Sequence, residues 1–420
     1  MVQKCLKGMS AVLFAALILC NAAAADEYHY VNQLIGDRAS GMAGAYTGVS
    51  DDVSGLYYNP AGIMYSSGTN LSASVNAYFD QKKTYDSVIG GNGWDRRSRA
   101  LLPNFFGITQ PIGKYKLGFS YAVPDSISEN QDQTFYDVPS TTPGITVTKY
   151  VINFNNDDNT YNFGPSLAAE ITKDITAGMT LYFHQRKNQI ILNQILTKNT
   201  TPVGFEWQNT YYELNEWGFR PILGVMWAPA EKLSVGVAVS KVMLMRSSTD
   251  IQSTSANWDA TGGTPLATGP TNSNPDAKRK YPFQVRTGVA YFVSSSLLVD
   301  LDLTYSGKVS DPEFGDRVAV VNAAAGAEYY FSKNLAVRGG FYTDMANTPE
   351  IKSDKTGQSE NVDIYGLSAS ISSFTRNTSI TLGGSYSMGS GEAQLISGST
   401  AIQDVETTGW TIYLSSSYSY

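Results

Sequence analysis

Residues 217–239 read WGFRPILGVMWAPAEKLSVGVAV, and this stretch decides the fold. Apolar side chains stand at every second position from Trp217 to Trp227 and again from Leu233 to Val239, which is the period of a β-strand. Residues 229–232 between the two runs are short enough for a tight turn. The stretch therefore predicts an antiparallel hairpin with one apolar face.

Alternation of the same kind recurs from residue 69 to the end of the sequence, and the connections between the alternating runs fall into two classes. Tight turns are predicted at residues 111–114, 173–174, 229–232, 294–296, 332–334 and 375–377. Long polar segments rich in Gly, Ser, Thr and Asn occupy residues 83–97, 125–158, 189–207, 246–279, 308–316, 346–360 and 391–406. Short turns at one end and long loops at the other are typical of an outer-membrane barrel.

The predicted strands add up to an even number. Six hairpins give twelve strands, and an opening strand at 70–82 and a closing strand at 407–420 make fourteen. A further alternating segment, residues 145–154, is assigned to the second long loop. An even count allows an antiparallel barrel to close, and closure removes the unpaired edges that lipid cannot satisfy. We therefore expect an all-β protein, a 14-stranded antiparallel transmembrane β-barrel over residues 69–420.

The last strand carries a second barrel feature. Trp410, Ile412, Leu414, Tyr418 and Tyr420 share one face, with Ser416 as the polar interruption. This pattern resembles the signal by which the bacterial barrel-assembly machinery recognises its clients, which would be a partner during biogenesis. The alternative is an ordinary amphipathic strand.

Composition agrees with a barrel and excludes other classes. The chain has 420 residues, of which 42% are hydrophobic, 12% aromatic and 16% charged. Mean hydropathy is −0.19, and no run approaches the roughly 18 to 20 apolar residues that a spanning helix needs. In a barrel only every second residue faces lipid, so such a mean is expected. A net charge of −7 disfavours a nucleic-acid binder.

Residues 1–25 have the features of a secretory signal peptide. Lys4 and Lys7 precede an apolar run at residues 9–19, and small residues at 22–25 provide a cleavage site before Asp26. Cys20 raises a lipoprotein alternative, which the bulky Leu19 before it disfavours. Both cysteines of the chain lie in this segment, so the expected mature chain has none.

Residues 26–68 do not alternate, and this segment contains the most specific motif. Arg38 to Ile63 read RASGMAGAYTGVSDDVSGLYYNPAGI, in which small residues permit close packing in a confined space. The stretch resembles the N-terminal hatch of the FadL family of outer-membrane transporters for long-chain fatty acids and other hydrophobic compounds. The family's Asn-Pro-Ala motif is matched by Asn59, Pro60 and Ala61. A 14-stranded barrel is too wide for its own side chains to fill, so a plug is physically reasonable.

The resemblance implies a function and a route. It implies a monomeric barrel in the bacterial outer membrane, surrounded by outer-membrane lipids and lipopolysaccharide, with residues 26–68 as the plug. Extracellular loops would capture the hydrophobic ligand, with long-chain fatty acids favoured. The ligand would pass to a pocket in the lumen, move the hatch, and leave sideways without energy coupling through a kink in the third strand. Gly118 in that strand is the candidate for this lateral opening, because strand glycines often mark bends.

The residues that alternate with the apolar faces are expected to point into the lumen. The charged ones are Lys116, Arg186, Arg220, Arg286, Arg338, Glu170, Asp300, Asp302 and Glu328, together with His184. Arg220, Arg286, Arg338 and Lys116 are the candidate ligand-binding residues, since a guanidinium grips a carboxylate with two hydrogen bonds. The competing interpretation is that these charges pair with one another or with Asp37, Arg38, Asp51 and Asp52 and hold the plug.

One loop is a candidate capture surface. Residues 189–207 contain the apolar side chains Ile191, Leu192, Ile195, Leu196 and Phe205, and an exposed apolar cluster often marks an interaction site. The alternative is that the flanking strands extend beyond the membrane. Loop 246–279 is polar, which leaves hydrophobic substrates other than fatty acids open.

Other functions find less support. The chain has only two histidines, His29 and His184, and offers no Ser, His and Asp arrangement, so we expect no enzyme. We expect no metal or cofactor either, because a mature chain without cysteine lacks the usual ligand clusters. Two alternatives to uptake stay open. One is a non-transporting barrel of the same superfamily that acts in protein secretion, and the other is a general porin.

Overall fold

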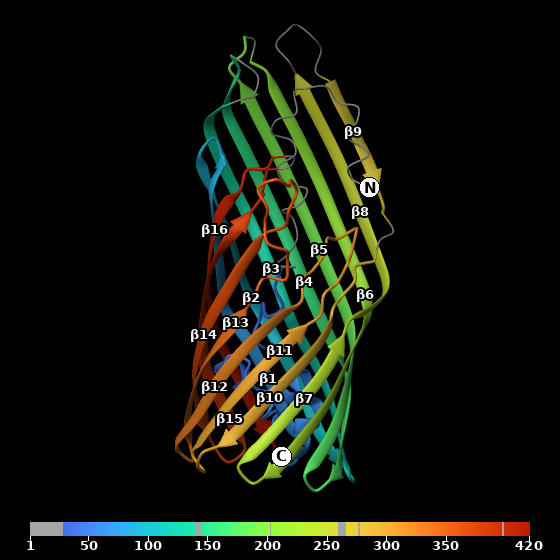
Figure 1. Ribbon diagram of the computed structural model, residues 1–420, viewed down its shortest axis with the longest axis vertical. Helices are drawn as coiled ribbons and strands as arrows, with labels where there is room; N and C mark the ends of the chain where they lie inside the picture. Colours follow the sequence, from blue (N-terminus) through green and yellow to red (C-terminus); the bar gives the residue numbers. More distant parts are fainter. Residues whose placement is uncertain (1–27, 140–143, 202, 259–265, 276–277, 397–398) are drawn as a thin grey trace.

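The structure is a computed structural model that describes residues 28–139, 144–201, 203–258, 266–275, 278–396 and 399–420. The expected signal peptide at 1–25 and the first two residues of the expected hatch lie outside the described residues. Most of the described chain forms one antiparallel sheet that closes into a barrel (Figure 1).

The hatch segment, defined here as residues 28–68, holds the short helices α1 (Arg38–Gly41) and α2 (Gly55–Tyr58) and the 3-10 helix η2 (Pro60–Tyr65). The barrel strands follow in chain order. They are β1 (Asn70–Ile89), β2 (Asn92–Ile112), β3 (Tyr115–Pro139), β4 (Thr146–Thr172), β5 (Ile175–Lys198), β6 (Phe205–Ala230), β7 (Leu233–Lys241), β8 (Met243–Trp258), β9 (Leu266–Ser273), β10 (Phe283–Phe292), β11 (Leu297–Ser306), β12 (Val320–Ser332), β13 (Leu335–Asp344), β14 (Asn361–Phe374), β15 (Thr378–Ala393) and β16 (Gln403–Ser419).

These segments make 14 barrel strands, as the sequence predicts. β7 and β8 pair in turn with the lower and upper parts of β6, and only Val242 separates them, so they form one strand. β9 and β10 likewise lie along β8 and β7 and form the next strand. The barrel closes because β1 pairs with β16 and β5 pairs with β6. All six predicted tight turns fall between consecutive strands.

The wall is much taller on one side. β3 to β6 are 24 to 27 residues long, whereas β10, β11 and β13 have 10 residues each (Figure 1). Roughly 9 to 11 tilted residues cross a bilayer, so the long strands extend well beyond that thickness. The prediction of long loops at 83–97, 125–158, 189–207 and 246–279 was therefore largely wrong, because most of these residues continue the strands. Residues 145–154, assigned to a loop, lie almost entirely within β4.

Side-chain orientation explains why these segments looked like loops. In the lower barrel the apolar side chains point outward, for example Leu167 on β4 and Met179 on β5. In the upper barrel the apolar side chains point inward, as Ile152 and Phe154 of β4 do. The upper apolar cluster, as we call this inner core, consists of Tyr85, Val88, Ile89, Trp94, Phe135, Val147, Tyr150, Ile152, Phe154, Ile190, Leu192, Leu196, Val362, Ile364, Ala393, Leu395 and Val405.

Candidate functional site

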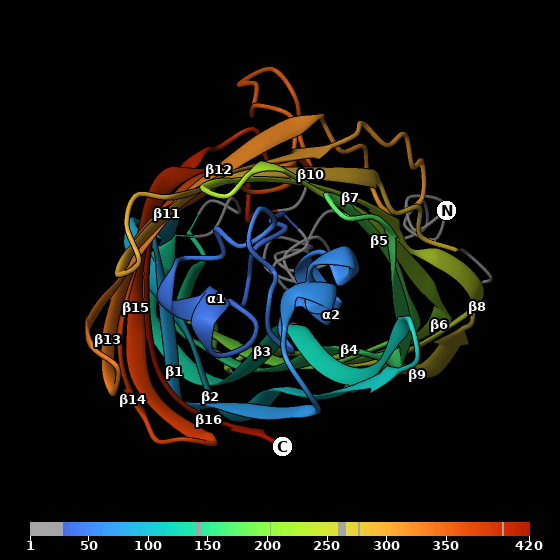
Figure 2. The same ribbon diagram turned by 90° about the horizontal axis from the view of Figure 1, so that it is seen from below.

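The hatch segment lies inside the lower barrel, where α1 and α2 are enclosed by the wall (Figure 2). Its apolar side chains form one core with inward-facing wall residues. That core contains Ile35, Ala39, Met42, Tyr46, Val49, Val53, Leu56, Tyr57, Tyr58 and Ile63 of the hatch segment, and Phe105, Ala122, Ala168, Tyr182, Ile222, Ala238, Ala290 and Leu298 of the wall. The lower lumen is thus filled by the segment that the sequence singled out.

The Asn-Pro-Ala motif fastens this segment to the wall. Asn59 is fully buried, and its Oδ1 accepts a hydrogen bond from the Ala61 amide at 3.2 Å. Its Nδ2 donates to the carbonyl oxygens of Thr47 at 3.2 Å and of Val225 on β6 at 3.1 Å. Pro60 opens η2, where its missing N–H costs no hydrogen bond. One side chain therefore joins two parts of the hatch segment to the barrel.

The wall makes room for the motif with glycines. A Cβ atom on Gly224 of β6 would lie 2.0 Å from Asn59 Oδ1, and one on Gly178 of β5 would lie 2.5 Å from the Pro60 carbonyl carbon. On β7, a Cβ on Gly236 would lie 1.9 Å from the Thr47 carbonyl oxygen. Only glycine allows the backbone of the hatch segment to approach this closely.

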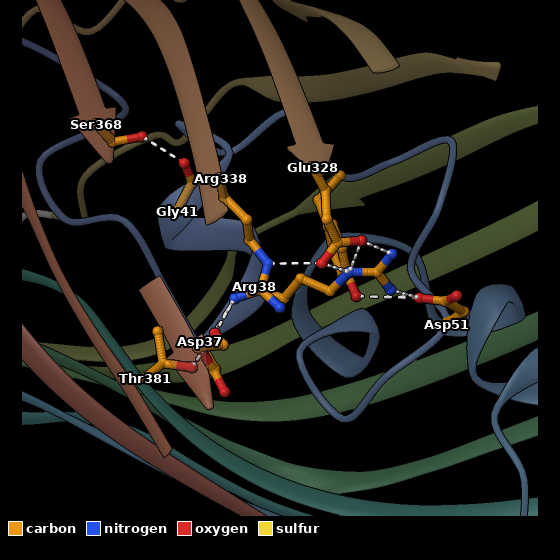
Figure 3. A network of polar contacts seen from close by, with 10 residues as sticks. Asp37, Arg38, Gly41, Asp51, Glu328, Arg338, Ser368 and Thr381 are labelled. Atoms are coloured by element: carbon orange, nitrogen blue, oxygen red, sulfur yellow. Dashed lines mark hydrogen bonds and ion pairs between the residues drawn. The ribbon is translucent and has the colours of Figure 1, made fainter. Parts of the chain in front are cut away.

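A buried ionic network anchors the other side of the hatch segment (Figure 3). Glu328 of β12 accepts hydrogen bonds from Arg38 Nε at 3.0 and 2.8 Å and from Arg338 Nε of β13 at 2.7 Å. Arg38 also forms an ion pair with Asp51, and Arg338 lies 4.0 Å from Asp37. Arg338 is thus committed to carboxylates that hold the plug, which matches the structural interpretation of the lumen charges.

Two further wall residues hold the hatch segment directly. Asp302 Oδ2 on β11 accepts hydrogen bonds from the backbone amides of Tyr46 at 3.0 Å and Thr47 at 2.8 Å. Lys116 Nζ on β3 donates to the carbonyl and hydroxyl oxygens of Ser66. Lys116 therefore contacts the last residues of the hatch segment, near an open cavity of ≈ 440 Å³ that Glu170 also lines.

Arg220 and Arg286 differ from the other lumen arginines. Within the described residues, neither forms an ion pair with a carboxylate. Their guanidinium carbons lie 5.1 and 5.2 Å from the ring centre of Tyr57 in α2, one from β6 and one from β10. Arg220 also donates to the Tyr57 hydroxyl at 3.4 Å. Burial alone would raise the pKa of this hydroxyl, but the two guanidinium groups outweigh it and lower that pKa. The hatch segment is thus gripped through an aromatic ring between two cations.

A cavity of ≈ 150 Å³ lies above Tyr57. Its lining includes Tyr30 of the hatch segment, Pro124 and Asp125 of β3, His184 of β5, Arg220 of β6 and Tyr281 just before β10. Arg186 and Arg279 also line it, and both approach the carboxylate of Glu216, at 3.9 and 3.4 Å. The cavity is rich in cations. Of the four residues predicted to bind the ligand, Arg220 is the one that lines it.

The wall beside the cavity contains an interrupted hydrogen-bond ladder. β2 and β3 pair from Ile112 to Phe105, and next only at Ser98, with the same register on both sides of the gap. Pro103 and Pro124 lie within the two unpaired stretches. Since proline has no N–H to donate, both residues weaken the ladder there. Because Pro124 also lines the cavity, the gap and the cavity adjoin each other.

Gly118, the sequence candidate for a lateral opening, lies lower on β3. It pairs with Thr109 on one side and Ser166 on the other, so the ladder is regular at this position. A Cβ there would lie 2.5 Å from Leu56 of the hatch segment. Gly118 thus accommodates the plug, and the irregular part of β3 begins beyond Ala122.

The five candidate capture residues do not form one surface. Leu192 and Leu196 point inward and belong to the upper apolar cluster. Ile191 and Ile195 point outward from the same strand, and Ile195 is 39% exposed. Phe205 begins β6 and contacts Trp258 of β8 with its ring. Strand extension, the alternative stated for this loop, is what the structure shows.

Three features of the site were not predicted from the sequence. Tyr57 was not singled out within the hatch motif, Tyr281 lies just beyond the predicted loop 246–279, and Pro103 and Pro124 were not associated with each other. The prolines could have indicated the gap, because a proline in each of two neighbouring predicted strands removes one backbone N–H donor from each strand.

None of the helices of the described residues is long and apolar enough to cross a membrane. None of their His, Cys, Asp and Glu groups has the arrangement of a metal site.

The fold and site together define a plugged β-barrel with an apolar outer belt, and solved structures of that class are similar to this chain. A FadL homologue of Pseudomonas aeruginosa superposes with a TM-score of 0.63 at 13% identity, over 93% of this chain and 99% of that one. The toluene transporter TodX of P. putida gives 0.66 at 13%, over 93% and 99%. The monoaromatic hydrocarbon channel CymD gives 0.57 at 13%, over 93% and 98%.

These similarities establish the fold of the FadL-type barrels for this chain. No family model matches the sequence, and no curated protein matches it. The resemblance seen in residues 38–63 is therefore confirmed at the level of the fold.

Proposed function

We propose that the protein is an outer-membrane channel for the uptake of hydrophobic compounds. It acts as a monomer by passive diffusion, with lipid and lipopolysaccharide around its apolar belt. The ligand enters from the upper end, reaches the cavity above Tyr57, and leaves sideways between β2 and β3. Residues 28–68 block the axial path, and their displacement accompanies passage.

One observation carries this proposal: the cavity adjoins the gap in the wall while the lumen below it is filled. A solute in the cavity meets the tightly packed hatch segment beneath it. Beside it, between Phe105 and Ser98 of β2, the ladder of β2 and β3 is interrupted. A sideways exit into the membrane suits a solute with an apolar body, whereas inorganic ions and wholly polar solutes would gain nothing from it.

The names of the similar structures supply the substrate class. They include transporters of toluene and monoaromatic hydrocarbons as well as a FadL homologue. Long-chain fatty acids, favoured by the hatch resemblance, are therefore one substrate for the test and toluene is another.

The test restores backbone N–H donors to the interrupted ladder of β2 and β3. Pro103→Val together with Pro124→Val supplies two backbone N–H groups where the β2 and β3 ladder is interrupted. We expect the wall to close and the uptake of labelled toluene or oleate by cells expressing the variant to fall at least about fivefold. The matched control is Pro165→Val on β4, because Pro165 interrupts the ladder of a different strand pair, β4 and β5 between Phe163 and Ser166, while its pairing with Phe119 of β3 is intact.

Unchanged uptake of both compounds in the double variant would contradict the lateral route. Single-channel conductance separates the channel from a general porin, since a plugged barrel should pass few ions. A large ohmic conductance in the unaltered protein would favour the porin.

A further inference from the structure

We propose that the cavity above Tyr57 binds a compact aromatic carboxylate, with the guanidinium of Arg220 holding the carboxylate group. This inference rests on the proposed function and specifies its substrate. It differs from both a long-chain fatty acid and a neutral hydrocarbon.

The size of the cavity sets the first limit. Its volume of ≈ 150 Å³ is that of a site for a single benzene ring, since an engineered cavity of about 150 Å³ binds benzene. Because the cavity is partly open, a long alkyl chain would fill it with only part of its length and extend beyond it. The aromatic residues Tyr57, Tyr281 and Phe314 contribute to the lining and offer ring faces and edges to a flat ligand.

The charge of the lining sets the second limit. Five cationic residues line the cavity, namely Arg186, Arg220, Arg279, Lys280 and Arg317, against the two carboxylates Asp125 and Asp311. Asp311 already accepts hydrogen bonds from the amides of Lys280, Glu313 and Phe314. Behind the lining, Asp158 pairs with Arg186, and Glu216 approaches Arg186 and Arg279. Four carboxylates thus face five cations, and the remaining single positive charge favours an anion.

Arg220 is the cation best placed to take that anion. It is only 7% exposed, and within the described chain it contacts the ring and the hydroxyl of Tyr57. Its hydrogen bond to Tyr57, at 3.4 Å, is long. A buried guanidinium with several donors unused gains two charge-assisted hydrogen bonds when a carboxylate arrives.

Two unused polar atoms in the same lining also point to a polar ligand. Nδ1 of His184 donates to Asn162 Oδ1 at 2.9 Å. This leaves Nε2 of His184 and Nδ2 of Asn162 buried without a hydrogen-bond partner in the described chain. His184 is 2% exposed and Asn162 is fully buried. A hydrocarbon would leave both atoms unsatisfied, whereas a carboxylate can accept a hydrogen bond from Asn162 Nδ2. With its proton on Nδ1, His184 Nε2 is an acceptor and needs a donor other than the carboxylate.

The experiment measures binding of benzoate, toluene and decanoate to the full-length mature protein in lipid nanodiscs, by isothermal titration. We expect benzoate to bind more tightly than toluene or decanoate. Arg220→Met keeps the aliphatic stem and removes the charge. It should weaken benzoate by about 10- to 100-fold, the range for charge-assisted hydrogen bonds, and leave toluene nearly unchanged.

The matched control is Arg286→Met. Arg286 packs on the same Tyr57 ring but is not among the residues that line the cavity. If loosening of the hatch segment were the cause, both variants would lose benzoate equally, so an equal loss would overturn the inference. Arg376→Met, in the exposed turn between β14 and β15, should have no effect on any probe.

Four outcomes are decisive. Benzoate binding that survives Arg220→Met would overturn the inference, and so would tighter binding of toluene or decanoate. If toluene or oleate uptake depends on Pro103 and Pro124 while benzoate does not bind, only this inference fails. If the proline double variant changes no uptake, the proposed function fails even with benzoate bound.

Discussion

Arg38 of the hatch segment and Glu328 of β12, 290 residues apart in the sequence, are joined by hydrogen bonds from Arg38 Nε to both carboxylate oxygens, at 3.0 and 2.8 Å. The same carboxylate accepts from Arg338 at 2.7 Å, and Glu328 is fully buried. One wall carboxylate therefore compensates two guanidinium groups, one on the plug and one on the barrel. The plug is held by charge as well as by shape.

Glu328→Gln removes this charge and preserves the side-chain volume. Both guanidinium groups then lose their shared counter-ion in a buried site, and breaking such a pair costs about 3 to 5 kcal/mol. We expect the amides of residues 38–58 to lose hydrogen-exchange protection by a corresponding amount, while those of β3 to β6 change little. Asp95→Asn removes an exposed ion pair with Lys82 and should cost less than about 1 kcal/mol. Equal protection in both variants would argue against an ionic anchor.

The neighbouring carboxylates Asp51 and Asp52 should respond differently to mutation. Burial, together with Asp51 and Asp37, raises the pKa of Asp52 to about 6, against the opposing effect of Arg38. With a raised pKa, the docked hatch segment takes up a proton on Asp52 before the undocked segment does. Docking should therefore become more favourable as pH falls from about 7 to about 4, by roughly 2 kcal/mol.

Asp52→Asn should reduce this dependence and strengthen docking at pH 7.5, since Asn can still accept the hydrogen bond that Ser54 N–H gives to Asp52 Oδ1 at 2.7 Å. Asp51→Asn should weaken docking by about 1 kcal/mol, because Asp51 forms an ion pair with Arg38. Hydrogen exchange of residues 38–58 between pH 5 and 8, corrected for intrinsic rates, measures both effects. The opposite order of the two variants would show that the pKa assignment is wrong.

Part of the fold could be predicted from the sequence. Strand number, tight turns and the position of the plug followed from period-2 alternation and from the motif around Asn59. The tall upper wall did not, because its alternation is out of phase with that of the lower wall. On β5 the apolar positions are Met179 and Leu181 below but Leu192 and Leu196 above, an odd-to-even change that a search for lipid-facing stripes discards.

The candidate site was only partly predictable for a different reason. Alternation placed Arg220, Arg286 and Arg338 in the lumen, but their roles depend on partners far away in the sequence. Arg338 meets Glu328 across two paired strands, whereas Arg220 meets Tyr57 of the hatch segment. The sequence held no information on which arginine lacked a carboxylate, since that depends on three-dimensional register.

Gly224→Ala should uncouple the Asn-Pro-Ala motif from the wall. Its Cβ would lie 2.0 Å from Asn59 Oδ1, so Asn59 must move and lose its hydrogen bond to Val225. We expect docking of the hatch segment to weaken by about 1 to 3 kcal/mol, the cost of overpacking, and single-channel conductance to rise. Gly339→Ala on β13 is the control, because a Cβ there would lie 3.7 Å from its nearest contact, the Ser368 carbonyl oxygen. An effect as large at Gly339 would point to strand propensity and away from the hatch contact.

Leu196→Ala and Ile195→Ala should separate the two faces of the upper wall. Leu196 is 5% exposed within the upper apolar cluster, whereas its neighbour Ile195 is 39% exposed and faces outward. Truncating a buried leucine costs about 2 to 5 kcal/mol, and an exposed apolar side chain contributes within about 0.5 kcal/mol. Limited proteolysis of the upper strands should therefore accelerate in Leu196→Ala alone.

If Ile195 instead takes part in ligand capture, Ile195→Ala would slow the uptake of labelled toluene without changing proteolysis. A loss of stability in Ile195→Ala equal to that in Leu196→Ala would contradict the inward assignment of the upper cluster.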